Sequence, residues 1–131
     1  MELLIDFPGG LAVNAHFGAH TIPTDQPAKA GGADAAPSPF ILFLASLGTC
    51  AGFYVLSFCR QRGLATDGIR VLERIRRDDA SGLVGQVDIE IQVPPDFPAR
   101  YHEALVRSAE HCTVKKHLEI PPRINTYTKV V

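Results

Sequence analysis

The sequence predicts an α+β protein in which mainly antiparallel strands pack on one long, apolar helix. Residues 40–59 contain no charged side chain, and this run is too long for one strand, so it predicts a helix. Residues 69–76 and 83–93 alternate apolar and polar side chains, which predicts a hairpin of two half-buried strands. At 131 residues we expect one domain spanning residues 1–131.

The ends of the central helix carry residues that suit a helix start and stop. Ser38 is a good N-cap, and Pro39 fits the first helical position, where a missing N–H costs nothing. Gly63 is the expected left-handed residue that ends the helix. The helix should therefore occupy about residues 39–62.

This helix is apolar all round rather than striped, so it must be buried on nearly every side. We expect no membrane partner, because no basic residue flanks its start and the strands that follow need a soluble core. One sheet and a short second helix cannot wrap it, which predicts a homodimer with two central helices inside. Ala45, Gly48 and Gly52 share a face that either fits local packing or lets a second copy approach.

The remaining segments complete the α+β pattern. Three short strands are predicted at residues 2–7, 11–17 and 19–24, followed by a long irregular loop at 25–37. The segment 98–118 reads as helical, with a break near residues 111–113. Alternation at residues 124–131 predicts a last strand.

Composition excludes several function classes. Basic and acidic residues number 13 and 14, without a basic stripe that carries aromatics, so we expect no nucleic acid partner. Three cysteines behind an N-terminus that does not resemble a signal peptide predict free thiols in the cytoplasm. Cysteine and histidine lack the spacing of a metal site, so we expect no metal and no cofactor.

The cysteines are the candidate reactive groups. Cys50 and Cys59 lie on opposite faces of the helix and should not pair with each other. Cys50 and Cys112 lie on separate helices, on faces that should turn inward, and are the pair we favour. The alternative is that all three are packing residues, since free cysteine is often buried. A reactive Cys50 needs a nearby cation or helix N-terminus, which its own helix does not supply at that position.

Two stretches carry a resemblance. PSPFILFLASLGTC, with Arg62-Gly63 after it, and AEHCTVKKHL at 109–118 resemble the OsmC/Ohr family of osmotically induced and organic hydroperoxide resistance proteins. The resemblance implies an OsmC-like intertwined homodimer and a cysteine-based peroxidase for organic hydroperoxides. It also implies that Cys50 is the peroxidatic cysteine, that Cys112 resolves it as a disulfide, and that an external dithiol restores both thiols.

The chain departs from the family at the groups that activate the cysteine. Members pair it with an arginine from the N-terminal part, oriented by a glutamate at the start of the central helix. Here Phe40 holds the glutamate position, and no arginine precedes Arg60. Substitute cations could come from the loop or the early strands: Lys29, His16 or His20. The residues expected to contact substrate are four aromatics and the loop lysine: Phe40, Phe43, Phe53, Tyr54 and Lys29.

Two other functions compete with the peroxidase. The missing arginine and glutamate favour an OsmC-fold protein without efficient peroxidase activity, which binds a hydrophobic small molecule at the dimer interface. The third candidate is a transferase or hydrolase that uses Cys50 with a histidine base.

Overall fold

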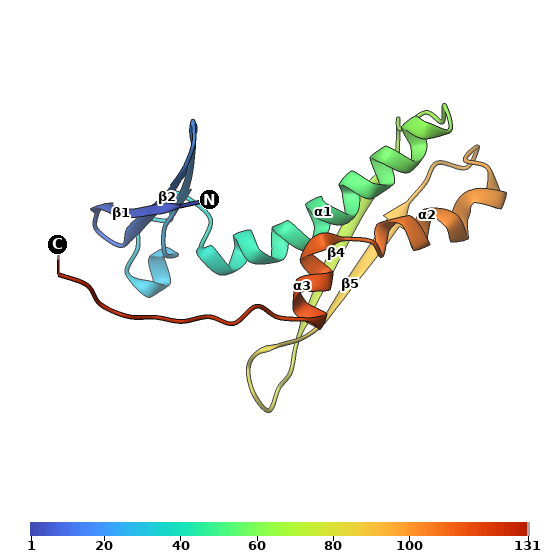
Figure 1. Ribbon diagram of the computed structural model, residues 1–131. Helices are drawn as coiled ribbons and strands as arrows, with labels where there is room; N and C mark the ends of the chain where they lie inside the picture. The colour runs from blue at the N-terminus through green and yellow to red at the C-terminus, as the bar shows by residue number, and fades with distance from the viewer. Residues whose placement is uncertain (131) are drawn as a thin grey trace. The chain divides into compact units, whose positions relative to one another are not determined.

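The computed structural model describes residues 1–130 and has the predicted α+β character (Figure 1). The chain forms two compact units, Met1–Ala45 and Ser46–Val131, which are described in turn. That residues 1–131 form a single domain stays a prediction.

The first unit contains the predicted meander of three strands. β1 (Leu4–Gly9) pairs with β2 (Ala12–Phe17), which pairs with β3 (His20–Thr24), all antiparallel. Pro23 lies in β3, an edge strand of this sheet, where proline's missing N–H can be tolerated.

The loop predicted at 25–37 is organised by one buried carboxylate. Asp25 accepts hydrogen bonds from the N–H groups of Gln26, Ala33 and Ala35, at 2.7, 3.1 and 3.2 Å. These bonds, led by the one from Ala35, lower the pKa of Asp25 against the opposing effect of desolvation. A short 3-10 turn, η1 (Ala28–Ala30), is the loop's one regular element.

The central helix α1 (Pro39–Gln61) begins and ends as predicted. Leu42 N–H donates to the Ser38 carbonyl at 3.1 Å, and Pro39 is the first helical residue. Gly63 has φ +63°, and Leu64 N–H returns to the Cys59 carbonyl at 3.0 Å, which closes the helix end. The helix is long and apolar enough to cross a membrane, a property that core helices of soluble proteins share.

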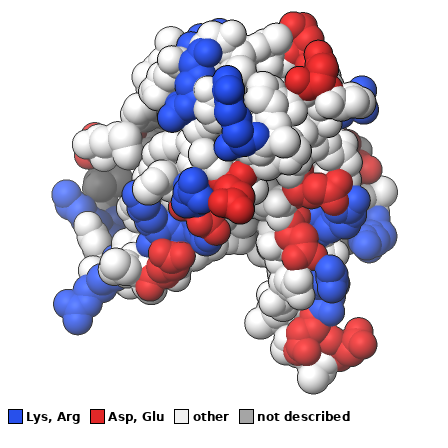
Figure 2. Space-filling model, turned by 90° about the vertical axis from the view of Figure 1, so that its right-hand side faces the viewer, with Lys and Arg blue, Asp and Glu red and all other residues white. Residues whose placement is uncertain are grey.

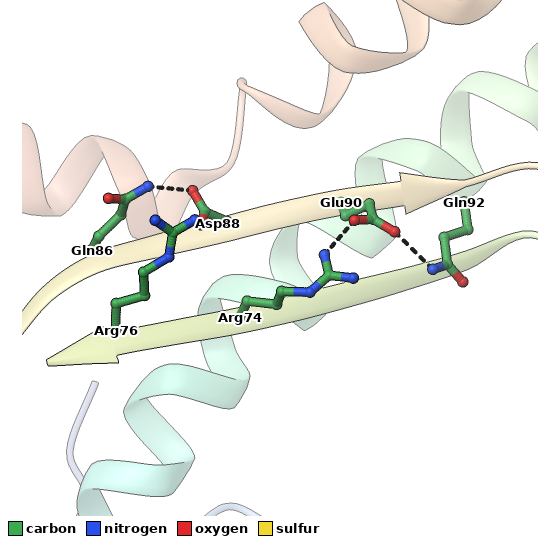
Figure 3. A network of polar contacts seen from close by, with 6 residues as sticks. All are labelled: Arg74, Arg76, Gln86, Asp88, Glu90 and Gln92. Atoms are coloured by element: carbon green, nitrogen blue, oxygen red, sulfur yellow. Dashed lines mark hydrogen bonds and ion pairs between the residues drawn. The ribbon is translucent and has the colours of Figure 1, made fainter.

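The second unit is built on the predicted hairpin of β4 (Arg70–Arg77) and β5 (Val84–Gln92). Polar side chains on its outer face pair across the strands (Figure 3). Arg74 binds Glu90, and Arg76 donates to Asp88 at 2.6 Å. These contacts match the expected solvated face with cross-strand pairing. Exposed ion pairs of this kind each contribute only a few tenths of a kcal/mol to about 1 kcal/mol of stability.

The other face of the hairpin packs on the helices. The 3-10 turn η2 (Ala99–Tyr101) leads into α2 (His102–Ala109), and α3 (Thr113–Glu119) follows. The gap between α2 and α3 is the break that the sequence predicted near residues 111–113. The core joins residues of α1 and α2 with one from the loop before η2: Ala51, Val55, Phe58, Cys59, Leu105, Ala109 and Phe97. Apolar residues of the hairpin pack against this core, so one side of α1 is held against the hairpin.

The small-residue face of α1 faces a strand in this chain. A Cβ built on Gly48 would lie 2.7 Å from Oε2 of Glu73, and one on Gly52 would lie 3.9 Å from Val71 Cγ2. Glu73 and Val71 both belong to β4. The sequence left two alternatives for this face, local packing or contact with a second copy of the chain. The structure supports local packing for Gly48 and Gly52, because their lack of side chains lets β4 approach α1.

The predicted C-terminal strand is wrong for the residues described. Residues 121–130 adopt no helix or strand, and Ile124, Tyr127 and Val130 are exposed. Residue 131, the last of the predicted strand, lies outside the described residues. Alternation alone does not make a strand, because the backbone also needs a neighbouring strand to bond with.

Glu73 gives a stability prediction. Its Oε1 is buried and has no hydrogen-bond partner in the part of the chain that the structure describes. Burial raises the pKa of the Glu73 carboxyl, opposed by a hydrogen bond from the Gly48 N–H. Glu73→Gln removes the charge and keeps an oxygen for that N–H. We expect the free energy of unfolding at pH 7 to rise by about 1 kcal/mol.

The sign follows from proton binding. A raised pKa means that the folded state binds protons more tightly than the unfolded state does. The stability that Glu73 contributes is therefore complete below its ordinary pKa of 4.5, and it is lost as the pH rises through the raised pKa. Urea unfolding as a function of pH should show this slope in the wild type and in the exposed control Glu119→Gln, and a flatter profile in Glu73→Gln. A Glu73→Gln protein that is less stable than wild type at pH 7 would contradict the assignment.

Candidate functional site

Cys112 lies at the turn between α2 and α3, where it caps α3. Its Sγ accepts a hydrogen bond from the Lys115 N–H at 3.4 Å. The same sulfur lies 3.9 Å from the Leu47 carbonyl oxygen, to which the thiol can donate. Cys112 is almost fully buried, so the break between the two helices places this thiol against α1.

Cys50 projects from α1 toward the start of α3. Desolvation acts to raise the pKa of its thiol, but hydrogen bonds from the Val114 N–H, the Cys112 side chain and the Thr113 N–H outweigh it and lower the pKa. Cys50 is half-buried, whereas Cys112 is buried. The structure thus brings Cys50 and Cys112 together as the favoured pair.

The two thiols are shifted in opposite directions. Burial raises the pKa of Cys112, and its hydrogen bond to Cys50 raises the pKa further, against a smaller lowering by the Lys115 N–H. Relative to ordinary thiols, the charged form of Cys50 is therefore stabilised and the protonated form of Cys112 is stabilised. An environment that separates two titratable groups in this way is typical of sites where one acts as nucleophile and the other as acid.

Cys59 belongs to the core and not to this pair. It is fully buried, and burial raises the pKa of its thiol despite the nearby charge of Arg62. For Cys59, the interpretation of a packing cysteine fits the structure.

The predicted substrate-contacting residues fall into two groups. Phe53 and Tyr54 lie on α1 in the second unit, with ring centroids 5.5 Å apart in an edge-on contact, and the Tyr54 hydroxyl is 3.4 Å from Thr113 Oγ1. Phe40 and Phe43 stack on each other at 5.7 Å in the first unit. Tyr54 thus reaches a residue whose amide faces Cys50, while the role of all four rings stays a prediction.

The substitute cations belong to the first unit. His16 has a partner at each ring nitrogen there: Nε2 lies 3.0 Å from Oδ2 of Asp6, and Nδ1 lies 3.2 Å from Oγ1 of Thr21. Lys29, in η1, and His20 are exposed. Their role beside Cys50 stays a prediction, whereas the groups that lower the pKa of Cys50 come from α3 and the turn before it.

An apolar cavity of about 360 Å³ lies beside Cys112. It is lined by residues of α1, β5, α2 and α3, and Glu110 and Lys115 supply its charged groups. Among residues 1–130, no group of three or more His, Cys, Asp and Glu side chains is arranged to hold a metal ion.

Sequence reasoning missed the amide donors at Thr113 and Val114. Every residue except proline carries a backbone N–H, so no residue type marks this role. One signal was present: the helix break predicted near residues 111–113 implies a new helix start close to Cys112, and a helix start has free N–H groups.

A family model for OsmC-like proteins matches residues 31–126, which is more than half of the chain and includes both cysteines. The chain belongs to the OsmC-like family. The resemblance noted in the two cysteine stretches is thereby confirmed. No curated protein matches the chain.

Solved structures of similar proteins share the OsmC-like fold. One, from Psychrobacter arcticus, is described as an osmotic stress induced and detoxification response protein; it has a TM-score of 0.73 at 22% identity, with 87% of this chain and 85% of that chain covered. Another is the organic hydroperoxide resistance protein OhrB of Bacillus subtilis, with a TM-score of 0.53 at 20% identity, covering 88% and 89%. An OsmC-like protein of Vibrio cholerae has a TM-score of 0.63 at 11% identity, covering 90% and 92%.

The amide donors at Cys50 can be tested by Thr113→Pro. Thr113 is the first residue of α3, where proline is favoured, and Cys112 before it has the extended ψ of 119° that a residue preceding proline adopts. The substitution removes one N–H from Cys50 and keeps the helix. We expect the pKa of Cys50 to rise by about one unit, since one hydrogen bond contributes about 1 kcal/mol.

The rate of iodoacetamide alkylation at each cysteine, measured against pH by mass spectrometry, reports the pKa. In the wild type Cys50 should titrate below the ordinary 9.0 and Cys112 above it. Thr113→Val is the matched control, because it loses the hydroxyl and keeps the N–H. Equal Cys50 pKa values in the proline and valine variants would show that the amide has no effect.

Proposed function

We propose that this protein is a thiol peroxidase that reduces organic hydroperoxides with Cys50 and Cys112. The observation that carries the proposal is the set of hydrogen bonds directed at Cys50, which lower the pKa of its thiol without the arginine and glutamate of other family members. The name of the Bacillus subtilis structure, an organic hydroperoxide resistance protein, supports the choice of substrate class.

The chemistry needs one nucleophile and one proton-bearing partner. The Cys50 thiolate attacks the terminal peroxide oxygen, the O–O bond breaks, and the alkoxide takes a proton and leaves as an alcohol. Cys50 is then a sulfenic acid. The Cys112 thiol attacks the Cys50 sulfur, water leaves, and a disulfide forms. An external dithiol, oxidised to its own disulfide, returns both thiols by exchange in a reducing compartment such as the cytoplasm.

A binding function is the second candidate, favoured by the apolar cavity beside Cys112. Its size, about 360 Å³, is in the range of small-molecule sites, which are commonly about 300–1,000 Å³. In that case the protein holds a hydrophobic molecule and Cys112 is part of the lining.

One reaction separates the two candidates. Reduced protein receives one equivalent of tert-butyl hydroperoxide, and intact mass and peptide mapping follow the cysteines. We expect rapid loss of two hydrogen atoms in a Cys50–Cys112 disulfide, no reaction in Cys50→Ser, and sulfenic or sulfinic acid at Cys50 in Cys112→Ser.

The core cysteine supplies the control for this experiment. Cys59→Ala should form the disulfide as the wild type does, because Cys59 is not part of the pair. A wild-type protein that is unchanged after many minutes would overturn the peroxidase and favour the binding function. Addition of dithiothreitol afterwards should restore the reduced mass.

We also propose that the protein is a homodimer. Phe53 and Leu56 on α1 are 62% and 37% exposed in the single chain, as are Leu4, Ile5 and Phe7 on β1 at 49–80%. Apolar surface of this kind is typical of protein interfaces. A second copy that covers α1 would bury it on the sides that the hairpin leaves open.

Substitution of Phe53 tests the dimer. Phe53→Glu places a charge on the exposed face of α1 and should shift the protein from dimer to monomer, measured by light scattering after gel filtration or by sedimentation. Leu83→Glu, which changes a 70% exposed apolar residue in the β4–β5 turn, is the control and should leave the dimer intact. A wild-type protein that is monomeric at about 100 μM would contradict the proposal.

A further inference from the structure

A second cavity, also of about 360 Å³, lies between the C-terminal half of α1 and α2. Unlike the apolar cavity beside Cys112, it is mainly polar. Ser57, Gln61 and Arg62 contribute from α1 and its end, and Arg107, Ser108 and His111 from α2 and the turn after it. Among residues 1–130, two arginines and no acidic side chain line the cavity, so its formal charge is positive.

Arg62 is held in a fixed position. Its guanidinium carbon lies 3.8 Å from the centre of the Phe58 ring, and Nη1 donates to the Phe58 carbonyl at 3.3 Å. The positive guanidinium also compensates part of the negative charge that the last carbonyl groups give to a helix C-terminus. Because a guanidinium has five N–H donors, the stacked Arg62 retains others for a ligand.

Arg107 is held only weakly. Its Nη1 lies 3.5 Å from Oε2 of Glu103, a side chain that is 91% exposed. An exposed pair at this distance contributes little, so an incoming anion competes readily for the guanidinium. Arg107 therefore faces the cavity as a charge that a ligand can recruit.

Neutral donors complete the lining. Gln61 Nε2 donates to Ser57 Oγ at 3.3 Å, which leaves the Ser57 hydroxyl proton for another acceptor. Two guanidinium groups with a hydroxyl nearby suit the oxygens of a carboxylate or phosphate, which accept paired N–H bonds. On the face drawn in Figure 2, Lys and Arg side chains are interspersed with Asp and Glu side chains.

We propose that this cavity binds the oxyanion of a small molecule, a carboxylate or a phosphate, between Arg62 and Arg107. Tyr54 also lines the cavity, and its hydroxyl lies 3.4 Å from Thr113 Oγ1. Thr113 is one of the two residues whose N–H groups bond to Cys50. The anion site thus adjoins the cysteine pair, while its binding groups are separate from the two thiols.

The test measures binding without any peroxide chemistry. Isotope-labelled Cys50→Ser protein is titrated at constant ionic strength with inorganic phosphate, with octanoate and with the uncharged octanol, and amide shifts of Ser108 and His111 are followed by NMR. Using Cys50→Ser makes the result independent of whether the protein is a peroxidase. We expect phosphate or octanoate to bind, and octanol to bind at least about tenfold more weakly.

Two variants localise the anion. Arg107→Gln should weaken binding about tenfold, and Arg100→Gln, an exposed arginine on η2 that stacks on Tyr101 outside the cavity, should leave it unchanged. Octanoate binding without phosphate identifies a carboxylate ligand, and phosphate binding without octanoate identifies a phosphate ligand. The proposal is overturned if neither anion binds at about 10 mM, if octanol matches octanoate, or if both variants lose affinity equally.

Discussion

The packing of α1 on the β4–β5 hairpin and α2 is the constraint on which the second unit depends. Ala51, Val55 and Cys59 turn one side of the helix into the core, where Leu105 and Ala109 of α2 meet them. Gly48 and Gly52 bring β4 close to the same helix. Once α1 is fixed in this way, Cys50 faces α3.

The lowered pKa of Cys50 then arises from main-chain amides together with the Cys112 side chain. In the family pattern an arginine, oriented by a glutamate, stabilises the thiolate, and here the glutamate position is Phe40. The start of α3 supplies instead two N–H groups, and the turn before it supplies the Cys112 thiol. Amides held by a folded helix start need no reorganisation when charge develops, which makes them effective partners for a thiolate. The resolving thiol that we propose would therefore serve twice, as donor first and as nucleophile afterwards.

The two cavities flank this site with different chemistry. The apolar cavity has Cys112 in its lining, and the positively charged cavity has Tyr54 in its lining. The exposed apolar side of α1, with Phe53 and Leu56, is a third surface, which we assign to a second copy of the chain.

The sequence by itself determined most of the elements and singled out Cys50 and Cys112 as candidates. The uncharged run predicted α1 and the cap residues its bounds, alternation predicted the hairpin, and a helix break was predicted near residues 111–113, because local patterns reflect local backbone preferences. The tertiary structure decided what lies against each element: Gly48 meets Glu73, the tail at 124–130 finds no strand to pair with, and the donors at Cys50 are amides. The physical reason is that packing and hydrogen bonding join residues distant in the chain, and an amide has no letter of its own in a sequence.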